Sequence, residues 1–322
     1  MLLSIISLVL TISFIVFVIW AAAVFWAWLG RGKPLRHVAE NDSITPETRQ
    51  AIEKMEAARA AKKLEVSGRE DPKAFRLSRS QLSEVCKAEG QARDGFLDQL
   101  CLGWYQIVMV FFIGSVLGLV LEEVWMFVTA GATESRVGLV WGPFSPLYGV
   151  GAVLLTLATF RLRKIHARGW LVFLVSMVIG GLLEQVTGWG METFMGAVSW
   201  DYIAGGVPGA ITKWVAVPFL FFWGLLGYLW YKLVMPNLLW GLGVPTTRRK
   251  AVFVALLSIY LALDIFMTTM CFGRRAERNA GIPPANAFEE WIDENYSNAF
   301  MAERFQNMVI DGVGGVRASI EG

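Results

Sequence analysis

The sequence predicts an all-α protein: a polytopic transmembrane helical bundle of about six spans, in which two helical hairpins form an internal repeat. Three observations predict this class. Hydrophobic residues make up 55% of the chain and charged residues only 17%, against about a quarter in soluble domains. Apolar runs recur with lengths near the roughly 20 residues that cross hydrocarbon. A short pattern around a glutamate also occurs twice, and the bilayer is therefore the expected solvent and partner.

The first apolar run, Leu2–Gly30, contains no charged residue and is followed by Arg31, Lys33 and Arg36. A cleaved signal peptide would begin with positive charge and have a shorter apolar core. Residues 1–30 are therefore predicted to form an N-terminal transmembrane anchor. Because Lys and Arg gather on its C-terminal side, we expect the N-terminus outside and the following residues inside.

Residues 31–100 are predicted to form a charged cytoplasmic connector that is partly helical. Acidic and basic residues alternate closely along it. Pro46 followed by Glu47 suits a helix start, since proline fits the first helical position and an acid fits the positive helix end. We expect this helix to reach about Val66 and a second helix to begin at about Ser80. A solvated connector and a docking surface for a soluble partner both fit.

Further apolar runs predict a four-helix membrane core over residues 101–240 and a last transmembrane helix over residues 241–273. The predicted spans are Leu102–Thr129, Phe144–Phe160, Gly169–Trp189, Ala216–Leu233 and Ala251–Cys271. The basic loops Arg161–Arg168 and Arg248–Lys250 indicate cytoplasmic turns and agree with an outside N-terminus. One cluster disagrees with the external C-terminus that this topology requires: Arg274, Arg275 and Arg278.

The internal repeat aligns Val116–Val124 with Val178–Val186 without gaps and places Glu122 on Glu184. Small residues stand one and two turns before each glutamate: Gly114, Gly118, Ser176 and Gly180. Small residues at every fourth position let helices approach closely in lipid. The acids therefore belong to packed helix faces. Duplication or convergence on one packing need would explain the match, and chance similarity between apolar helices is the alternative.

An ionised carboxylate inside hydrocarbon costs about 2.5–3.5 kcal/mol on insertion scales, so it normally faces the protein interior and has a partner. We hypothesise that Glu122 and Glu184 line one polar cavity that opens outward, neutralised by Arg136 and Lys213. The same pathway would include Glu123, Glu192 and Asp201. The alternative is a set of interfacial acids that only lock the hairpins together.

The segment from Trp141 to Gly149 contains two prolines and two glycines among aromatic residues. Because proline removes a donor and bends the chain, a plain helix is excluded there, whereas a loop or re-entrant turn buried in protein is allowed. We expect a lid over the acidic cavity, with a helix start in an aromatic belt as the alternative. The lid residues are Trp141, Gly142, Pro143, Pro146, Tyr148 and Gly149, with Trp200 and Tyr202 in the second half.

Two features follow the core. Asp264 is a lone acid midway along the last span, where a cation relay or a hydrogen bond to a neighbouring helix would explain it. Residues 274–322 predict an amphipathic, acidic tail. Phe288, Trp291 and Ile292 share one face of a predicted helix that would lie on the membrane or on the protein.

Several classes are excluded. Two histidines and three scattered cysteines give no metal-ligand spacing, and no metal or other cofactor is expected. A net charge of +2 without a basic patch argues against a nucleic-acid partner. The chain carries no HExxH, GxSxG or similar motif, so we expect no enzyme.

Five stretches carry a resemblance to a known family: GLVLEEV, SRVGLVWGPFSPLYGVGA, GGLLEQVTGW, SWDYIAG and FFWGLLGYLWYKLVMP. In this order they resemble the bacterial family of putative ABC-transporter type IV, or CmpB-like, membrane proteins over roughly Val108 to Pro236. The residues that carry the resemblance are Glu122, Arg136, Gly142, Pro143, Pro146, Tyr148, Gly149, Glu184, Trp200, Asp201, Tyr202 and Pro236. Lys213 stands where the family pattern has an arginine, and lysine lacks the planar two-pronged donor.

The resemblance implies a permease or transporter subunit in the bacterial inner membrane. The chain has no G-x-x-x-x-G-K-[ST] phosphate cradle, so a separate ATPase subunit would dock on the cytoplasmic side. A homo-oligomer is compatible with the same sequence. A membrane scaffold that assembles envelope proteins is the main alternative, and an enzyme acting on a lipid-linked substrate is less favoured.

Overall fold

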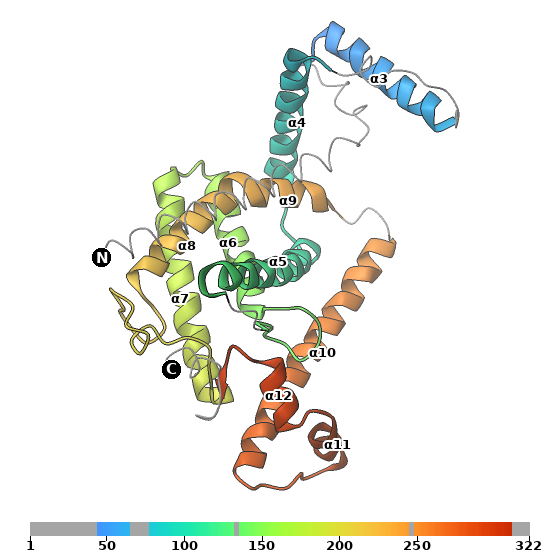
Figure 1. Cartoon of the computed structure of the whole chain (residues 1–322). Helices are drawn as coiled ribbons and strands as arrows, with labels where there is room; N and C mark the ends of the chain where they lie inside the picture. Colours follow the sequence, from blue (N-terminus) through green and yellow to red (C-terminus); the bar gives the residue numbers. More distant parts are fainter. Residues whose placement is uncertain (1–43, 65–76, 132–134, 245–247, 311–322) are drawn as a thin grey trace. The chain divides into compact units, whose positions relative to one another are not determined.

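The computed structural model describes residues 44–64, 77–131, 135–244 and 248–310, which are mostly helical (Figure 1). The chain divides into two compact units, residues 1–94 and 95–322, and each is described by itself. The predicted N-terminal anchor lies outside the described residues.

The first unit contains α3 (Pro46–Leu64) and most of α4 (Arg79–Gln99). Both helices begin within a residue of their predicted starts. Their contact is small and apolar and is made by Ile44, Ile52, Val85 and Ala88. The Glu84 carboxylate of α4 accepts hydrogen bonds from the hydroxyls of Thr48 (2.6 Å) and Thr45 (2.8 Å). These hydrogen bonds lower the pKa of Glu84 and join the beginning of α3 to α4.

Within its described residues, the second unit contains four helices that are long and apolar enough to cross a membrane. They span Trp104–Val128, Gly169–Met195, Val217–Leu242 and Arg248–Asn279. Each corresponds to one of the predicted spans. The helical membrane class is therefore confirmed, whereas the count of about six spans stays a prediction.

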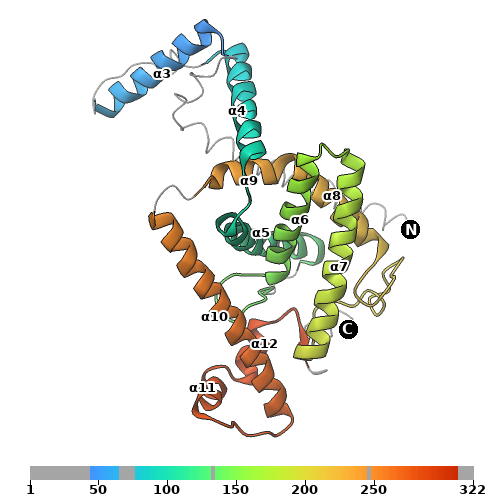
Figure 2. The same ribbon diagram turned by 180° about the vertical axis from the view of Figure 1, so that it is seen from behind.

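The remaining predicted span of the core, α6 (Pro146–Lys164), is shorter than the others. Its apolar part, residues 146–160, is about 22 Å long at 1.5 Å per residue, against about 30 Å of hydrocarbon. Arg161, Arg163 and Lys164 end this part. Helix α6 lies between α5 (Trp104–Ala130) and α7 (Gly169–Met195) and packs against both (Figure 2).

The third apolar helix is continuous from α8 (Val217–Leu229) through the π-helical turn η1 (Trp230–Val234) to α9 (Met235–Leu242). Pro236 lies two residues after the end of the π turn, in the first turn of α9. Proline has no N–H, and its ring crowds the preceding turn of an α-helix. A wider turn at this point relieves the crowding and lets the helix continue.

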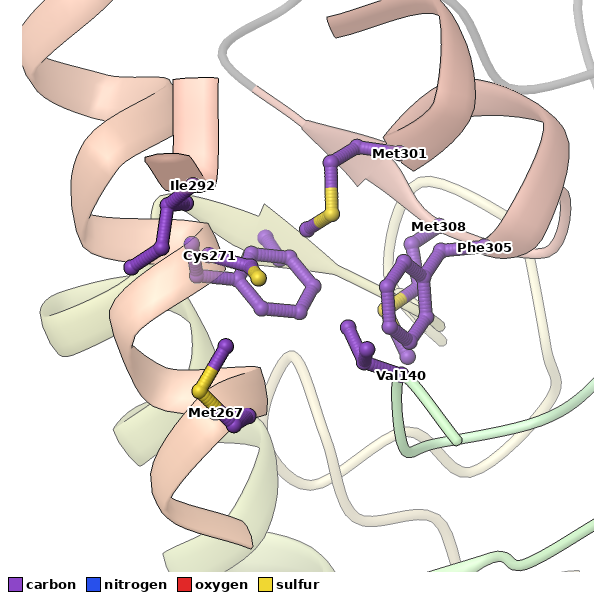
Figure 3. Close-up of a cluster of buried hydrophobic side chains, with 9 residues drawn as sticks. Val140, Met267, Cys271, Ile292, Met301, Phe305 and Met308 are labelled. Atoms are coloured by element: carbon purple, nitrogen blue, oxygen red, sulfur yellow. The ribbon is translucent and has the colours of Figure 1, made fainter. Parts of the chain in front are cut away.

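Two hairpins make up the core, α5 with α6 and α7 with α8. Helix α10 (Arg248–Asn279) packs on α5, and its far end is covered by α11 (Ala287–Asn295) and α12 (Asn298–Arg304). The short strands β1 (Ala197–Val198) and β2 (Val309–Ile310) pair antiparallel. Figure 3 shows the buried cluster under this tail, whose members include Val140, Met267, Cys271, Ile292, Met301, Phe305 and Met308. The tail therefore folds back onto the protein.

Candidate functional site

In the first hairpin the structure brings Glu122 and Arg136 together. Glu122 lies near the end of α5, and Arg136 lies in the loop that follows it. The guanidinium Nη1 donates to the Glu122 carboxylate at 2.5 Å, and the two side chains are only 13% and 22% exposed, Arg136 being the more buried. A largely buried acid therefore has its opposite charge supplied by the adjacent loop. Glu123, the next residue, is exposed.

Tyr148 completes this arrangement from α6. Its ring lies against Gly118, where an added Cβ would overlap the tyrosine Cβ and ring. Tyr148 also interacts with the Glu122 carboxylate. The absence of a side chain at Gly118 thus lets an aromatic residue of the next helix reach the acid.

In the second hairpin Glu184 has a different environment. Its side chain is 7% exposed. Its Oε1 accepts hydrogen bonds from Trp223 Nε1 at 3.0 Å and from the Tyr202 hydroxyl at 3.3 Å. Its Oε2 is buried and has no hydrogen-bond partner among the described residues. Glu184 is therefore a half-satisfied carboxyl group inside a spanning helix.

The expected pairing of Lys213 with Glu184 is corrected by the structure. The Lys213 ammonium lies 2.6 Å from Glu192 and 4.0 Å from Asp201. Its own carbonyl accepts from the N–H of Tyr202 at 2.8 Å, which closes the second outer loop on itself. This closure holds the lysine at the end of α7, two helical turns beyond Glu184. The lysine is consequently placed with Asp201, as expected, but not with the buried acid.

The two hairpins share one packing pattern. In the first, Gly118 lies against Tyr148, and Gly114 lies against Ala152 one turn further along α6. In the second, Gly180 lies against Trp223, and Gly227 of α8 lies against Ser176 one turn further along. In both, the aromatic residue that covers the glycine also contacts the glutamate one turn later.

The cavity expected between Glu122 and Glu184 is not among the cavities that the structure describes. The smaller described cavity is lined by Leu102, Gln106, Ile107, Val110, Val153, Thr156 and Leu157. The larger lies between the beginnings of α5 and α10. Each acid is turned toward the partner helix of its own hairpin, so a shared cavity stays a prediction.

The segment expected as a lid forms an irregular loop that ends where α6 begins, at Pro146. The N–H of Trp141 donates to the Asp264 carboxylate at 2.9 Å, and the N–H of Val140 donates to the Thr268 hydroxyl at 2.9 Å. The Trp141 indole N–H donates to the hydroxyl of Tyr296 at 3.0 Å. The loop therefore contacts α10 and the tail, and Tyr148, already in α6, is the residue of this segment that interacts with Glu122.

Asp264 has a different partner from the one expected. Its carboxylate is fully buried, and one of its oxygens accepts from loop backbone rather than from a neighbouring helix. Segments that cannot form a regular ladder need such donors and acceptors when they are buried. Asp264 thus anchors the loop to α10.

Arg304 is a residue that the sequence did not identify. Its guanidinium donates to the carbonyl of Leu139 at 3.1 Å and to that of Gly142 at 2.5 Å. Burial lowers the pKa of Arg304. An arginine in a charged tail carries no signal of a partner so distant in the chain, so sequence patterns alone could not find this contact.

Two of the three arginines that disagreed with an external C-terminus, Arg274 and Arg278, form ion pairs with acidic residues. Arg274, only 2% exposed, lies 2.5 Å from Asp293 and 3.4 Å from Glu289, and it also pairs with Glu277. Arg278 pairs with Asp293 as well. Because the positive-inside rule counts Lys and Arg and is not a net-charge rule, these ion pairs leave the disagreement with an external C-terminus in place.

Chemically, the described residues offer carboxylates, indoles and hydroxyls rather than a metal centre. No group of three His, Cys, Asp or Glu side chains within the described ranges is placed to hold a metal ion.

Comparisons with curated proteins and with solved structures give no match. The family model described as putative ABC-transporter type IV matches residues 109–269. The matched region starts inside α5, contains both hairpins and ends inside α10, so it includes Glu122, Glu184 and Asp264. The chain belongs to the putative ABC-transporter type IV family.

Proposed function

We propose that this transporter-related membrane protein is a permease subunit whose polar pathway passes Glu184 and opens to the outside. The observation that carries the proposal is the unpartnered Oε2 of Glu184, buried in a spanning helix. A buried carboxyl oxygen without a donor costs free energy in the resting state. A cation, a proton or a donor group of a substrate would remove that cost by binding there.

The loop from Val137 to Ser145 supports this proposal. Its Trp141 N–H donates to Asp264, which lies about 24 Å from the beginning of α10 at Arg248, at 1.5 Å per residue. Irregular backbone at such a depth is tolerated where it is buried in protein or lines a cavity. Broken backbone near intramembrane acids is a frequent feature of transport sites.

An ATPase subunit is part of the same proposal. It would dock on the cytoplasmic side, against the Arg161–Arg168 turn or the helices α3 and α4. Its presence is checked by purifying the complex from native membranes, and complexes that never contain a nucleotide-binding subunit would contradict it.

A membrane scaffold is the second candidate, and a specific observation favours it. The ion pairs of Arg136, Lys213 and Arg274 satisfy these bases locally, as expected in a core built for rigidity. Glu184 separates the candidates, because its buried carboxyl group accepts only from neutral donors and forms no ion pair among the described residues. The family description is that of a transporter component and not of an enzyme.

Cysteine accessibility tests the pathway without knowledge of the substrate. In a variant whose three native cysteines are replaced, Glu184→Cys should react with a membrane-impermeant thiol reagent added from outside. Val186→Cys, two residues away and 62% exposed on the lipid-facing side, is the matched control and should not react. Equal, negligible reaction at both positions would favour the scaffold. Glu184→Gln should fold and be expressed as well as the unmodified protein. At equal expression it should nevertheless abolish any transport phenotype.

A further inference from the structure

A cavity of about 300 Å³ lies at the opposite end of the bundle from the acids. It is formed by the first turns of α5 and α10. Its lining consists of Tyr105, Met109, Arg249, Lys250, Phe253 and Val254. None of these residues takes part in the site proposed above.

Contacts among the helix ends define this end of the bundle. The Gln106 amide donates to the Gly243 carbonyl at 2.8 Å, which ties the beginning of α5 to the segment before α10. The Lys164 ammonium donates to the Leu100 carbonyl at 3.0 Å, which brings the basic end of α6 to the same place. Both basic turns of the predicted topology therefore meet here, and the positive-inside rule assigns this end to the cytoplasmic leaflet.

The lining is divided by chemistry. Arg249 and Lys250 are exposed and form a cationic rim. Tyr105 and Val254 are buried, so the floor is apolar and aromatic. Phe253 is 57% exposed beside the rim and continues the apolar wall outward along α10. The first turn of a helix also carries partial positive charge, which adds to the attraction for an anion.

We infer that this cavity binds an anionic phospholipid of the cytoplasmic leaflet. Its phosphate would lie at Arg249 and Lys250, and its acyl chains would extend past Phe253 along the lipid-facing side of α10. Basic pockets between transmembrane helices on the cytoplasmic side suit such headgroups. A free phosphate would use the rim alone and leave the apolar wall without a role. A zwitterionic lipid would add the cation of its own headgroup to a site that already has two cations, Arg249 and Lys250.

The test uses the purified full-length protein in neutral detergent and measures lipid binding by native mass spectrometry. The probes are phosphatidylglycerol, phosphatidylcholine with the same chains, and glycerol phosphate. We expect phosphatidylglycerol to bind best. The double variant Arg249→Gln with Lys250→Gln should weaken that binding at least about tenfold, since each basic residue near the surface contributes about 1 kcal/mol.

The matched control is Arg161→Gln with Arg168→Gln, which removes the same charge from two exposed residues at the same end. It should leave the affinity within about twofold. Phe253→Gln should weaken phosphatidylglycerol but leave glycerol phosphate unchanged. Equal losses in the two double variants, equal binding of both lipids, or glycerol phosphate binding as tightly as the lipid would each overturn the inference.

Discussion

The two hairpins use the same packing for acids in different electrostatic situations. Glu122 has a full opposite charge in Arg136, whereas Glu184 has only the neutral donors of Trp223 and Tyr202. In both, a glycine one turn earlier admits the aromatic residue that reaches the acid. The small residues that precede each glutamate on its helix therefore account for the shared packing of the two hairpins. Whether the acid is neutralised depends on its partner, which is a base only in the first hairpin.

The loops that follow α5 and α7 differ in the same way. The loop of the first hairpin is held from outside, by Asp264 of α10 and by Arg304 of the tail. The loop of the second hairpin is paired with the tail only at its start, through β1 and Ser199, and is otherwise closed by its own residues. Trp200 Nε1 donates to the Trp214 carbonyl at 3.1 Å, and the Asp201 carboxylate accepts from the N–H groups of Ile203 and Ala204. Beyond β1, the second loop therefore makes its closing contacts itself and does not depend on Asp264 or Arg304.

The largest expected effect tests whether the two hairpins depend equally on the glycine that precedes each glutamate by one turn. Gly118→Ala and Gly180→Ala would each place a Cβ inside the base of an aromatic side chain. Each should lower the free energy of unfolding by about 3 kcal/mol, at the upper end of overpacking costs, because these aromatic atoms lie next to backbone. Thermal unfolding in detergent measures both changes.

Gly190→Ala is the matched control in α7, since a Cβ there meets nothing within 4 Å. It should be neutral or slightly stabilising through helix propensity. A large cost in only one of the two hairpins would show that their packing is not equivalent.

A smaller effect tests the partners of the acids. Glu122→Gln removes the carboxylate that neutralises the largely buried Arg136. We expect the free energy of unfolding to fall by about 1–2 kcal/mol, which is below the value for a fully buried pair because both side chains are partly exposed. Glu184→Gln should cost almost nothing, because its carbonyl still accepts from Trp223 and no base loses a partner. The double variant Glu122→Gln with Arg136→Gln should recover much of the first loss. Equal stability losses for the two single variants would contradict the contrast.

The smallest effect concerns how the first loop is held. Hydrogen bonding to Arg274 holds the pKa of Asp293 below its usual value. A depressed folded-state pKa stabilises the fold above the unfolded value of about 3.9, and that stability is lost as the pH falls through the folded pKa. Docking of α11 should therefore be constant from about pH 7 to pH 5 and weaken below about pH 4.

Asp293→Asn should reproduce this loosening at neutral pH. Hydrogen exchange in α11 should rise by about fivefold, as expected for loss of a partly exposed ion pair. Exchange in the loop from Val137 to Ser145 should rise with it, whereas residues 200–216, which lie beyond the pairing of β1 with the tail, should not change. A rise in both loops would show that the second loop also depends on the tail.

Local patterns predicted the helices and the nearest ion pair. Hydropathy identified the long apolar helices, and the start of α3 followed from Pro46. Arg136 was identified as the partner of Glu122 because it follows the same helix closely. These predictions depend on residues near each other in the chain, where the pattern contains the geometry.

The partners of Glu184 and of the first loop could not be predicted in this way. Trp223 lies on another helix, and its reach to Glu184 depends on how closely α7 and α8 pack at Gly180. Lys213 was assigned to Glu184 from charge alone, but the backbone closure of its loop places it beside Glu192. Arg304 meets Gly142 through the fold of the tail. Such contacts depend on tertiary packing, which no local period encodes.

The contact of Arg304 with Gly142 spans 162 positions of the chain. During synthesis on the ribosome, both hairpins would emerge long before the guanidinium that completes the loop between α5 and α6. The carbonyls of Leu139 and Gly142 can accept these hydrogen bonds only after Arg304 has been synthesised, so this loop is completed after both hairpins. Completion of the loop between α5 and α6 thus depends on a residue synthesised 162 positions later.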